Sequence, residues 1–157
     1  MNITELKPEL IWNIFDQITK VPRPSKKEEK IREFLLNFAK EHGIEVKTDA
    51  IGNVEMLKPA APGHENAPVV ILQGHMDMVC EKNNDVEHNF DTDPIQTIIE
   101  GEWVHANGTT LGADNGIGMA AALAVMVDKS IVCGPVKALF TVDEETGLTG
   151  ANALGDG

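Results

Sequence analysis

Apolar residues recur at helical spacing in the first part of the chain. They stand three or four positions apart, at Leu10, Ile11, Ile14, Phe15 and Ile18. This spacing gives one apolar face and predicts an amphipathic helix over residues 7–18. The two prolines in residues 21–24 bring this helix to an end.

A second helix is predicted directly afterwards. Ser25 and Glu28 have the spacing of a capping box, a motif in which two side chains bond the backbone at a helix start. The buried stripe of this helix comprises Ile31, Phe34, Leu35 and Phe38, and His42-Gly43 closes it.

The other apolar runs predict short strands and a core helix. We expect strands at residues 45–48, 53–57, 69–72, 97–99, 103–105 and 135–142, and a surface loop at 59–68. The run at 69–72 is typical of a strand buried on both faces. Residues 117–127 are apolar nearly all round and predict a helix packed on the sheet, and a further helix starts at 148–154. Helices alternating with apolar strands indicate an α/β fold with a mainly parallel sheet, whose ligands bind outside the carboxyl ends of the strands.

Composition narrows the function without defining it. The 157 residues fit one domain, and 25 acidic against 13 basic residues give a net charge of -12, which disfavours nucleic acid and anionic membranes as partners. No apolar run is long enough to cross a membrane and no secretion signal is visible, so we expect a cytoplasmic protein. Cys80 and Cys133 are expected to be reduced, buried thiols.

Candidate chemistry begins after the strand at 69–72, where His75 and Asp77 stand two residues apart. In an extended segment this spacing brings both side chains to the same side, so the carboxylate can hold the imidazole in one tautomer, as it does for metal-ligating histidines. As a bare pattern His-x-Asp is weak, because an isolated buried histidine is more often simply hydrogen-bonded.

Asp114 lies in a glycine-rich stretch, residues 112–118, that leads into the predicted core helix. Such a loop could cradle a phosphate, but an acidic side chain at its centre argues against an anion there. The alternative is that Asp114 or Asn115 only caps the helix. A cap and a metal ligand are compatible roles for a carboxylate at the edge of the sheet.

Two adjacent glutamates, Glu144 and Glu145, follow the strand at 135–142, with Asp143 beside them. Neighbouring carboxylates repel one another, which favours a bound cation, although a solvated acidic turn is the simpler alternative. Alternation along the chain is expected to send one glutamate to each side, so that one binds metal while the other faces the attacking water.

All three motifs fall at or just after strand ends, and together they predict a hydrolytic site with two zinc ions. Imidazole and carboxylates suit zinc, and a carboxylate has two oxygens with which to bridge two ions. No serine or cysteine nucleophile motif is present. Other candidates are interpreted as structural: His42, His64, His88 and His105 as surface residues, Trp12 and Trp103 as packing groups, and residues 81–93 as a solvated acidic loop.

These motifs resemble those of a known family. The stretches QGHMDMVCEKN (residues 73–83), GTTLGADNGIG (108–118) and DEETGLTGA (143–151) look like the signatures of aminoacyl-histidine dipeptidases. These enzymes, also called peptidase D or cytosol non-specific dipeptidases, belong to the zinc peptidase family that includes peptidase T, peptidase V and carnosinase. Residues 21–25 are similar to the N-terminal region of the same branch.

The resemblance implies a fold, two cofactors and roles for five residues. His75 would bind the first zinc, Asp77 would orient and polarise that histidine, and Asp114 would bridge both ions, with the peptide bond after it cis. Glu144 would be the general base and Glu145 would bind the second zinc. The implied fold is the aminopeptidase-like catalytic domain of the zinc peptidases. Its two zinc ions could be replaced by cobalt or manganese, and its substrates are unblocked dipeptides, including Xaa-His.

Two ligands that the family requires have no counterpart in this sequence. The resemblance implies a later Asp and a His near the C-terminus of a much longer chain, together with a lid and dimerisation domain. Asp156 follows Glu145 too closely to be the later Asp. Residues 1–157 are therefore expected to be the N-terminal part of the catalytic domain, inactive alone, from a parent that forms a homodimer.

Two other functions stay open on the sequence. A non-catalytic binding module could keep the same fold, but it would be expected to lose Glu144 or a ligand, and every expected residue of this span is present. An acylase or carboxypeptidase of the same family would share the metal chemistry, and only the peptidase D character of the motifs argues against it.

Overall fold

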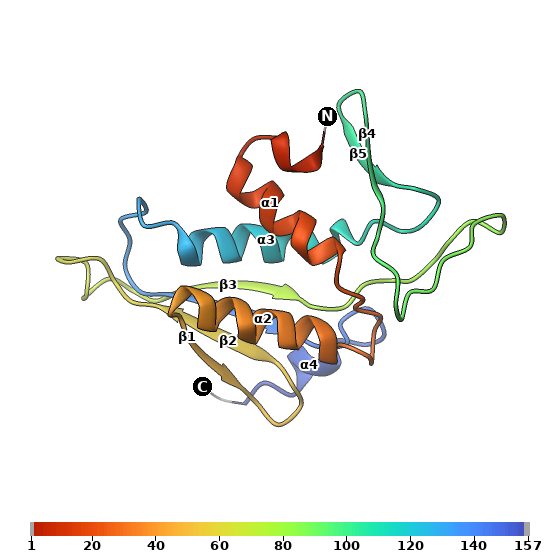
Figure 1. The fold of residues 1–157 in the computed structure, drawn as a ribbon. Helices are drawn as coiled ribbons and strands as arrows, with labels where there is room; N and C mark the ends of the chain where they lie inside the picture. Colours follow the sequence, from red (N-terminus) through yellow and green to blue (C-terminus); the bar gives the residue numbers. More distant parts are fainter. Residues whose placement is uncertain (1, 156–157) are drawn as a thin grey trace.

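The computed structural model describes residues 2–155 as an α/β fold, with helices packed on a four-stranded sheet (Figure 1). Its elements are η1 (Ile3–Glu5), α1 (Glu9–Thr19), α2 (Glu29–His42), β1 (Glu45–Thr48), β2 (Val54–Lys58), β3 (Val70–His75), β4 (Thr97–Glu100), β5 (Trp103–Ala106), α3 (Ala113–Val127), β6 (Val136–Thr141) and α4 (Thr149–Asn152). The strand order of the main sheet is β1-β2-β6-β3. α2 contacts β1 and β2, α3 contacts β3 and β6, and α1 packs on α3.

Both N-terminal helices form where the apolar spacing predicts them. Along α1 the side chains of Ile14, Phe15 and Ile18 are buried, and Trp12 packs edge-to-face on Phe15, with ring centroids 6.0 Å apart. Gly43 is the C-cap residue of α2, and its φ of 66° is a left-handed conformation that glycine adopts without steric cost.

The start of α2 differs from the prediction, because Ser25 and Glu28 do not form a capping box. Glu28 is the N-cap residue, but its side chain makes no capping hydrogen bond. The Ser25 hydroxyl donates to Asp77 Oδ2, and Glu28 accepts the backbone N–H of Asp143. Buried polar groups at the strand exits need partners, and this need overrides the local motif.

The core lies on one face of the main sheet. Its buried strand positions are paired, Val54 with Phe140 and Met56 with Ala138, and they form one cluster with the buried side chains of α1, α2 and α3. Strand alternation leaves the opposite face more polar, and Lys137 there pairs with Glu55 at 3.0 Å.

The main sheet is mixed, so the prediction of a mainly parallel sheet is wrong. β3 and β6 are parallel, whereas β1–β2 and β2–β6 are antiparallel. β1 and β2 form a hairpin, and Asp49 closes its turn by accepting the N–H groups of residues 51–53 through Oδ1. The prediction rested on strands alternating with helices. No helix lies between β1 and β2, so these two strands pair antiparallel.

β3 pairs only with β6 in the part of the chain that the structure describes, which makes it an edge strand. The prediction that residues 69–72 are buried on both faces is therefore wrong. Val69, Val70 and Ile71 are exposed, Ile71 by 58 %. The strand becomes buried only at its end, at Gly74 and His75.

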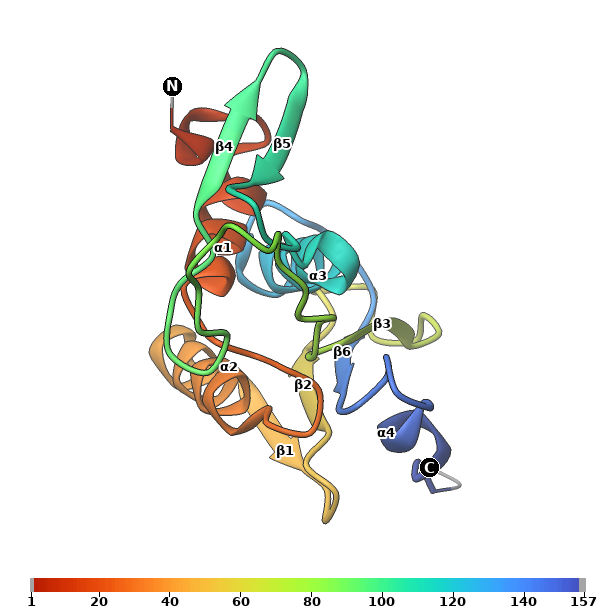
Figure 2. The same cartoon turned by 90° about the vertical axis from the view of Figure 1, so that its right-hand side faces the viewer.

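The β4–β5 hairpin forms where predicted and extends away from the main sheet (Figure 2). Trp103 is 76 % exposed on it, so the prediction that Trp103 packs is wrong, whereas Trp12 joins the core. Residues 81–93 form the expected, mostly exposed loop, and Lys27 bonds it through Asp91 at 2.8 Å. Cys80 and Cys133 are free thiols, only partly buried. Between residues 2 and 155, no helix has the length and apolar character needed to cross a membrane.

We predict that residues 1–157 on their own self-associate through the unpaired edge of β3. Free backbone N–H and C=O groups beside apolar side chains favour the addition of another strand. Ile71→Lys should shift the population towards monomer, because a charge on an edge strand opposes pairing. Sedimentation velocity over a range of concentrations measures the shift. Leu10→Lys, at an exposed apolar position on α1, is the control, and an equal effect of the two substitutions would contradict the edge-strand explanation.

Candidate metal centre

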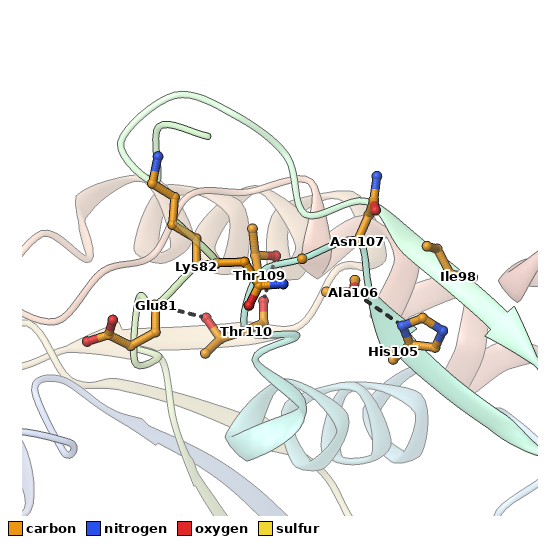
Figure 3. Close-up of a pocket in the computed structure, with 10 residues that line it drawn as sticks. Glu81, Lys82, Ile98, His105, Ala106, Asn107, Thr109 and Thr110 are labelled. Carbon is orange, nitrogen blue, oxygen red and sulfur yellow. Dashed lines mark hydrogen bonds between the residues drawn. The ribbon is translucent and has the colours of Figure 1, made fainter. Parts of the chain in front are cut away.

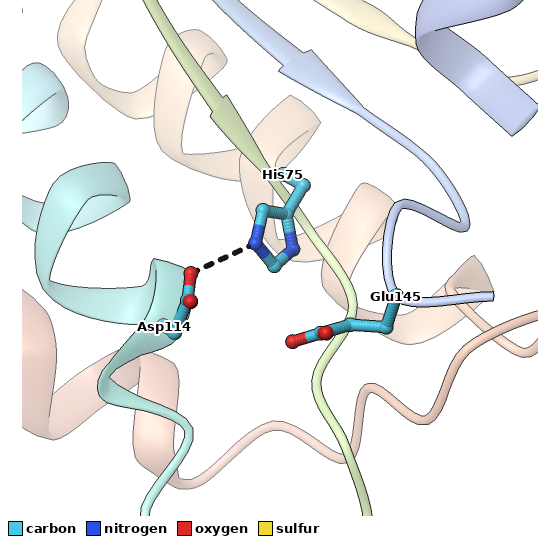
Figure 4. A group of neighbouring side chains, drawn as sticks. All are labelled: His75, Asp114 and Glu145. Carbon is cyan, nitrogen blue, oxygen red and sulfur yellow. Dashed lines mark hydrogen bonds and ion pairs between the residues drawn. The ribbon is translucent and has the colours of Figure 1, made fainter. Parts of the chain in front are cut away.

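The carboxyl ends of β3 and β6 lie side by side, because the strands are parallel and their last residues pair in register. Asp77 follows β3, and Glu144 and Glu145 follow β6, so all three leave the same edge of the sheet. The start of α3 brings Asp114 to the same place (Figure 4). The ligand atoms of His75, Asp114 and Glu145 all lie within 4.8 Å of one another.

His75 is buried, and both nitrogens of its ring have acidic partners. Nδ1 lies 3.2 Å from Asp77 Oδ1 and 3.1 Å from the carbonyl oxygen of the same residue. Nε2 lies 3.0 Å from Asp114 Oδ1. When Nδ1–H donates to Asp77, the ring is held in one tautomer and Nε2 is left to face a cation.

Asp77 has no exposed surface and accepts hydrogen bonds from four groups. Besides His75, the donors are the Ser25 hydroxyl at 2.7 Å and the backbone N–H groups of Glu144 and Glu145 at 3.0 and 3.2 Å. Burial by itself would raise the pKa of this carboxyl, but the hydrogen bonds outweigh burial and hold the pKa well below its ordinary value. Asp77 is therefore a buried, ionised anchor for the loops around it.

Both glutamates reach the neighbourhood of the His75 ring. Glu144 Oε2 lies 3.7 Å from His75 Nε2, and Glu145 belongs to the three-residue cluster. The prediction that alternation sends them to opposite sides is wrong, because the chain turns after β6. Asp143 has a φ of 49°, and the next two N–H groups both point to Asp77. The turn that carries the two glutamates is thus anchored on the buried carboxylate of Asp77, whereas a freely solvated acidic turn would have no such anchor.

Asp114 is an exposed residue at the start of α3, with 83 % of its side chain accessible. The backbone angles of Asp114 and Asn115 are non-helical, so α3 kinks at these two residues. Within residues 2–155, neither side chain makes the hydrogen bond that the helix-cap alternative requires. The peptide bond between Asp114 and Asn115 is cis, as the resemblance implies. The Asn115 side chain packs on Gly118, where a Cβ would lie 1.9 Å from Asn115 Oδ1.

The charge of this cluster fits a metal ion. Burial lowers the pKa of His75, but hydrogen bonds to Asp77 and Asp114 outweigh burial and raise the pKa to about 9. Burial raises the pKa of Glu145; His75 opposes this shift, and the neighbouring carboxylates add to it. Both groups respond to an excess of negative charge, which a positive ion relieves. An imidazole with carboxylate oxygens is also a donor set that zinc uses.

A second carboxyl group cluster, formed by Glu28, Asp77 and Asp143, is buried and adjoins the first through Asp77. The carboxylates of this second cluster already accept hydrogen bonds from nearby donors. Glu28 Oε1 accepts two backbone N–H groups, one of them from Asp143, and Asp143 accepts the hydroxyls of Thr146 and Thr149. These carboxyls therefore support the strand exits through hydrogen bonds and need no ion.

Sequence reasoning missed the part that Ser25 and Glu28 play in this support. Their spacing predicts a local capping box, whereas their partners lie 52 and 115 positions further along the chain. The one available signal was the similarity of residues 21–25 to the N-terminal region of the family.

A polar pocket of about 560 Å³ opens beside the β4–β5 hairpin (Figure 3). The pocket is lined by residues 81–83, Ile98 and residues 105–110, with Lys82 and His105 on opposite sides. None of the five predicted site residues belongs to its wall. The candidate chemistry is thus centred on the open edge of the sheet and not in this pocket.

Comparison with known proteins points to the same part of the chain. A sequence profile of Peptidase family M20/M25/M40 matches residues 71–157, which contain all five predicted site residues. The chain is 51 % identical over 152 residues to the cytosol non-specific dipeptidase of Escherichia coli (strain K12), a match that covers 97 % of this chain and 31 % of that protein.

Two solved structures share the fold. Aminoacylhistidine dipeptidase from Vibrio alginolyticus is 52 % identical, with a TM-score of 0.95, and the match covers 98 % of this chain and 31 % of that one. The aminopeptidase PepT of Bacillus cereus is 28 % identical, with a TM-score of 0.74, and the match covers 96 % of this chain and 40 % of that one. The chain therefore spans 31 % of the length of the two dipeptidases that it matches.

We predict that Glu28→Ala lowers the free energy of unfolding by about 1–3 kcal/mol, because it leaves the buried N–H of Asp143 without an acceptor. Glu28→Gln should cost less than about 1 kcal/mol, since the amide oxygen can still accept this bond. Burial also raises the pKa of Glu28, so a neutral side chain is tolerated there. Urea unfolding at one protein concentration compares the variants, and equal losses would refute the assigned hydrogen bond.

Proposed function

The chain belongs to peptidase family M20/M25/M40, and from this membership and the His75 cluster we propose that it forms part of a zinc-dependent dipeptidase. One observation carries the proposal: the buried ring of His75 is held at Nδ1 by Asp77, while Nε2 faces the carboxylate of Asp114. A histidine that served only packing would not need acidic partners on both ring nitrogens.

The metal ligands proposed within this chain are His75, Asp114 and Glu145. Asp114 would bridge two zinc ions, and the mutual approach of the three side chains supports this assignment. Asp77 would stay outside the ligand set, because its oxygens are taken by His75, Ser25 and the backbone. Its role would be to orient His75 and increase the basicity of the ring.

Glu144 is the proposed general base. Its carboxylate lies 3.7 Å from His75 Nε2, so it can reach a water molecule placed beside this nitrogen. When bound, the zinc ions would supply Lewis acidity towards the attacking water and the scissile carbonyl. Glu144 would take a proton from the water as its oxygen adds to the carbonyl carbon. The same carboxyl would then give this proton to the amine nitrogen as the C–N bond breaks.

We propose unblocked dipeptides, including Xaa-His, as the substrates. The names of the Escherichia coli and Vibrio alginolyticus relatives support a dipeptidase, as does their identity of 51 % and 52 % to this chain. The negative charge of the site also supports this proposal, because its exposed carboxylates attract the positively charged amino terminus of a small peptide.

The rest of the active site is proposed to lie outside residues 1–157. A later Asp and a late His would complete the two metal sites, and a lid would cover the substrate, in a homodimer working in the cytoplasm. The family resemblance supports these features, and the name of the Escherichia coli relative supports the compartment.

We predict that Glu144→Gln in the complete protein keeps both zinc ions and lowers kcat about 10²- to 10⁴-fold, because an amide cannot accept the water proton. Zinc content by elemental analysis and the rate of dipeptide hydrolysis measure the two effects. Glu102→Gln, at an exposed position on the hairpin, is the control. Activity within a few-fold of wild type would reject Glu144 as the base, and loss of zinc would mean that Glu144 and Glu145 exchange roles.

We also predict that the complete protein binds two zinc ions per chain, whereas residues 1–157 alone bind zinc more weakly and do not hydrolyse dipeptides. Three ligands shared between two ions give each ion about two, where a catalytic zinc usually has three. Calorimetric titration with zinc and an assay with β-alanyl-histidine compare the two forms. One zinc or none in the complete protein would refute the bridge, and metal-dependent turnover by monomeric residues 1–157 would refute the need for further ligands.

A further inference from the structure

We propose that Arg23 is a positioning residue that holds the segment of His75 and Asp77 against the turn of Asp114, so that the metal ligands meet. The inference rests on the proposed function, because it concerns the same site. In the sequence, Arg23 lies between Pro22 and Pro24 at the end of a predicted helix, within the stretch 21–25 that resembles the N-terminal region of the family. No ligand motif contains it.

The guanidinium of Arg23 joins two loops that are distant in sequence. Nη1 donates to the carbonyl oxygens of Met76 at 3.1 Å and Asp77 at 3.0 Å, and Nη2 donates to the carbonyl oxygen of Gly112. The carbonyl oxygen of Arg23 itself accepts the N–H of Met78 at 3.1 Å. One residue thus fixes the backbone that follows His75 to the backbone that precedes Asp114.

Arg23 makes these contacts at a buried position, only 2 % exposed. None of the ion pairs among residues 2–155 includes Arg23. Its side-chain hydrogen bonds all go to backbone carbonyl oxygens. Burial of a charge without an ion pair is costly, so a fold keeps it only where other contacts compensate. Here the three hydrogen bonds to backbone carbonyl oxygens compensate. Burial lowers the pKa of Arg23 to about 10, and attraction to Asp77, Cys80, Glu145 and Asp114 only partly opposes that shift.

The glycine-rich turn is shaped around this guanidinium. A Cβ on Gly112 would lie 2.4 Å from Nη2 of Arg23, and a Cβ on Gly116 would lie 2.8 Å from the same atom. Two glycines that flank Asp114 therefore make room for the arginine. This gives the turn a purpose other than phosphate binding, and it ties the position of Asp114 to the presence of Arg23.

The geometry makes a lysine an inadequate replacement. A guanidinium presents its donors in a rigid, planar fork, which here reaches both loops at once, whereas an ammonium is a single point of donation. Arg23→Lys should therefore keep the charge but lose the link between the loops. Loss of residues that support metal ligands typically lowers metal affinity or activity by about 10- to 100-fold.

The test uses the complete protein and measures zinc affinity by competition with a chelator, with kcat and KM for a dipeptide as a second readout. We expect Arg23→Lys and Arg23→Ala to weaken zinc binding about 10- to 100-fold and to lower kcat more than they raise KM. Millimolar guanidinium should partly restore zinc affinity in Arg23→Ala by filling the vacated position. Urea, which is planar but uncharged, should not restore it at the same concentration.

The chain supplies a matched control, because its one other arginine, Arg32, lies on α2, where it packs over Gly52. Arg32→Lys should leave zinc affinity unchanged. Wild-type zinc affinity in both Arg23 variants would overturn the inference, as would an equal loss in Arg32→Lys. If Arg23→Ala fails to fold, the comparison of Arg23→Lys with Arg32→Lys still decides. A wild-type protein that binds no zinc would overturn the proposed function itself, whereas the other outcomes bear on Arg23 alone.

Discussion

A buried carboxylate needs hydrogen-bond donors on both of its oxygens, and Asp77 finds them on segments of chain that are far apart in sequence. Ser25 comes from the linker between α1 and α2, His75 from the end of β3, and the N–H groups of Glu144 and Glu145 from the turn after β6. Each donor is held in place because Asp77 would otherwise be an uncompensated buried charge. The site is therefore organised around a carboxylate that has no exposed surface.

The side chains around this anchor differ sharply in exposure. Asp77 and His75 are buried, while Asp114 is exposed and the two glutamates are partly so. The imidazole is thus held by buried hydrogen-bond partners, whereas the carboxylates beside it lie at the surface. Arg23 links the buried residues to the exposed ones, because its guanidinium donates to the backbone at Asp77 and at Gly112.

Much of the site was predictable from sequence because its residues follow apolar runs. His75, Asp77, Asp114, Glu144 and Glu145 could be grouped from their places after predicted strands, and the two N-terminal helices from apolar spacing. Features that depend on distant partners could not be predicted in this way. Ser25 and Glu28 satisfy a local capping rule, and only the folded chain brings Asp77 and Asp143 within their reach. The exposure of Ile71 and the antiparallel pairing of β2 with β6 were missed for a similar reason, because strand composition does not specify a strand's neighbours.

The in-register pairing of β3 with β6 limits how this protein can change in length over evolution. Side chains alternate between the two faces of a strand, so one residue inserted into either strand would turn the following positions to the wrong side of the sheet. An insertion just before His75 would separate it from the turn that carries the glutamates, even though every site residue survived. The tip of the β4–β5 hairpin has no such constraint, because it extends away from the sheet and lines no part of the cluster. Related proteins should therefore accumulate insertions at the hairpin and keep the lengths of β3 and β6.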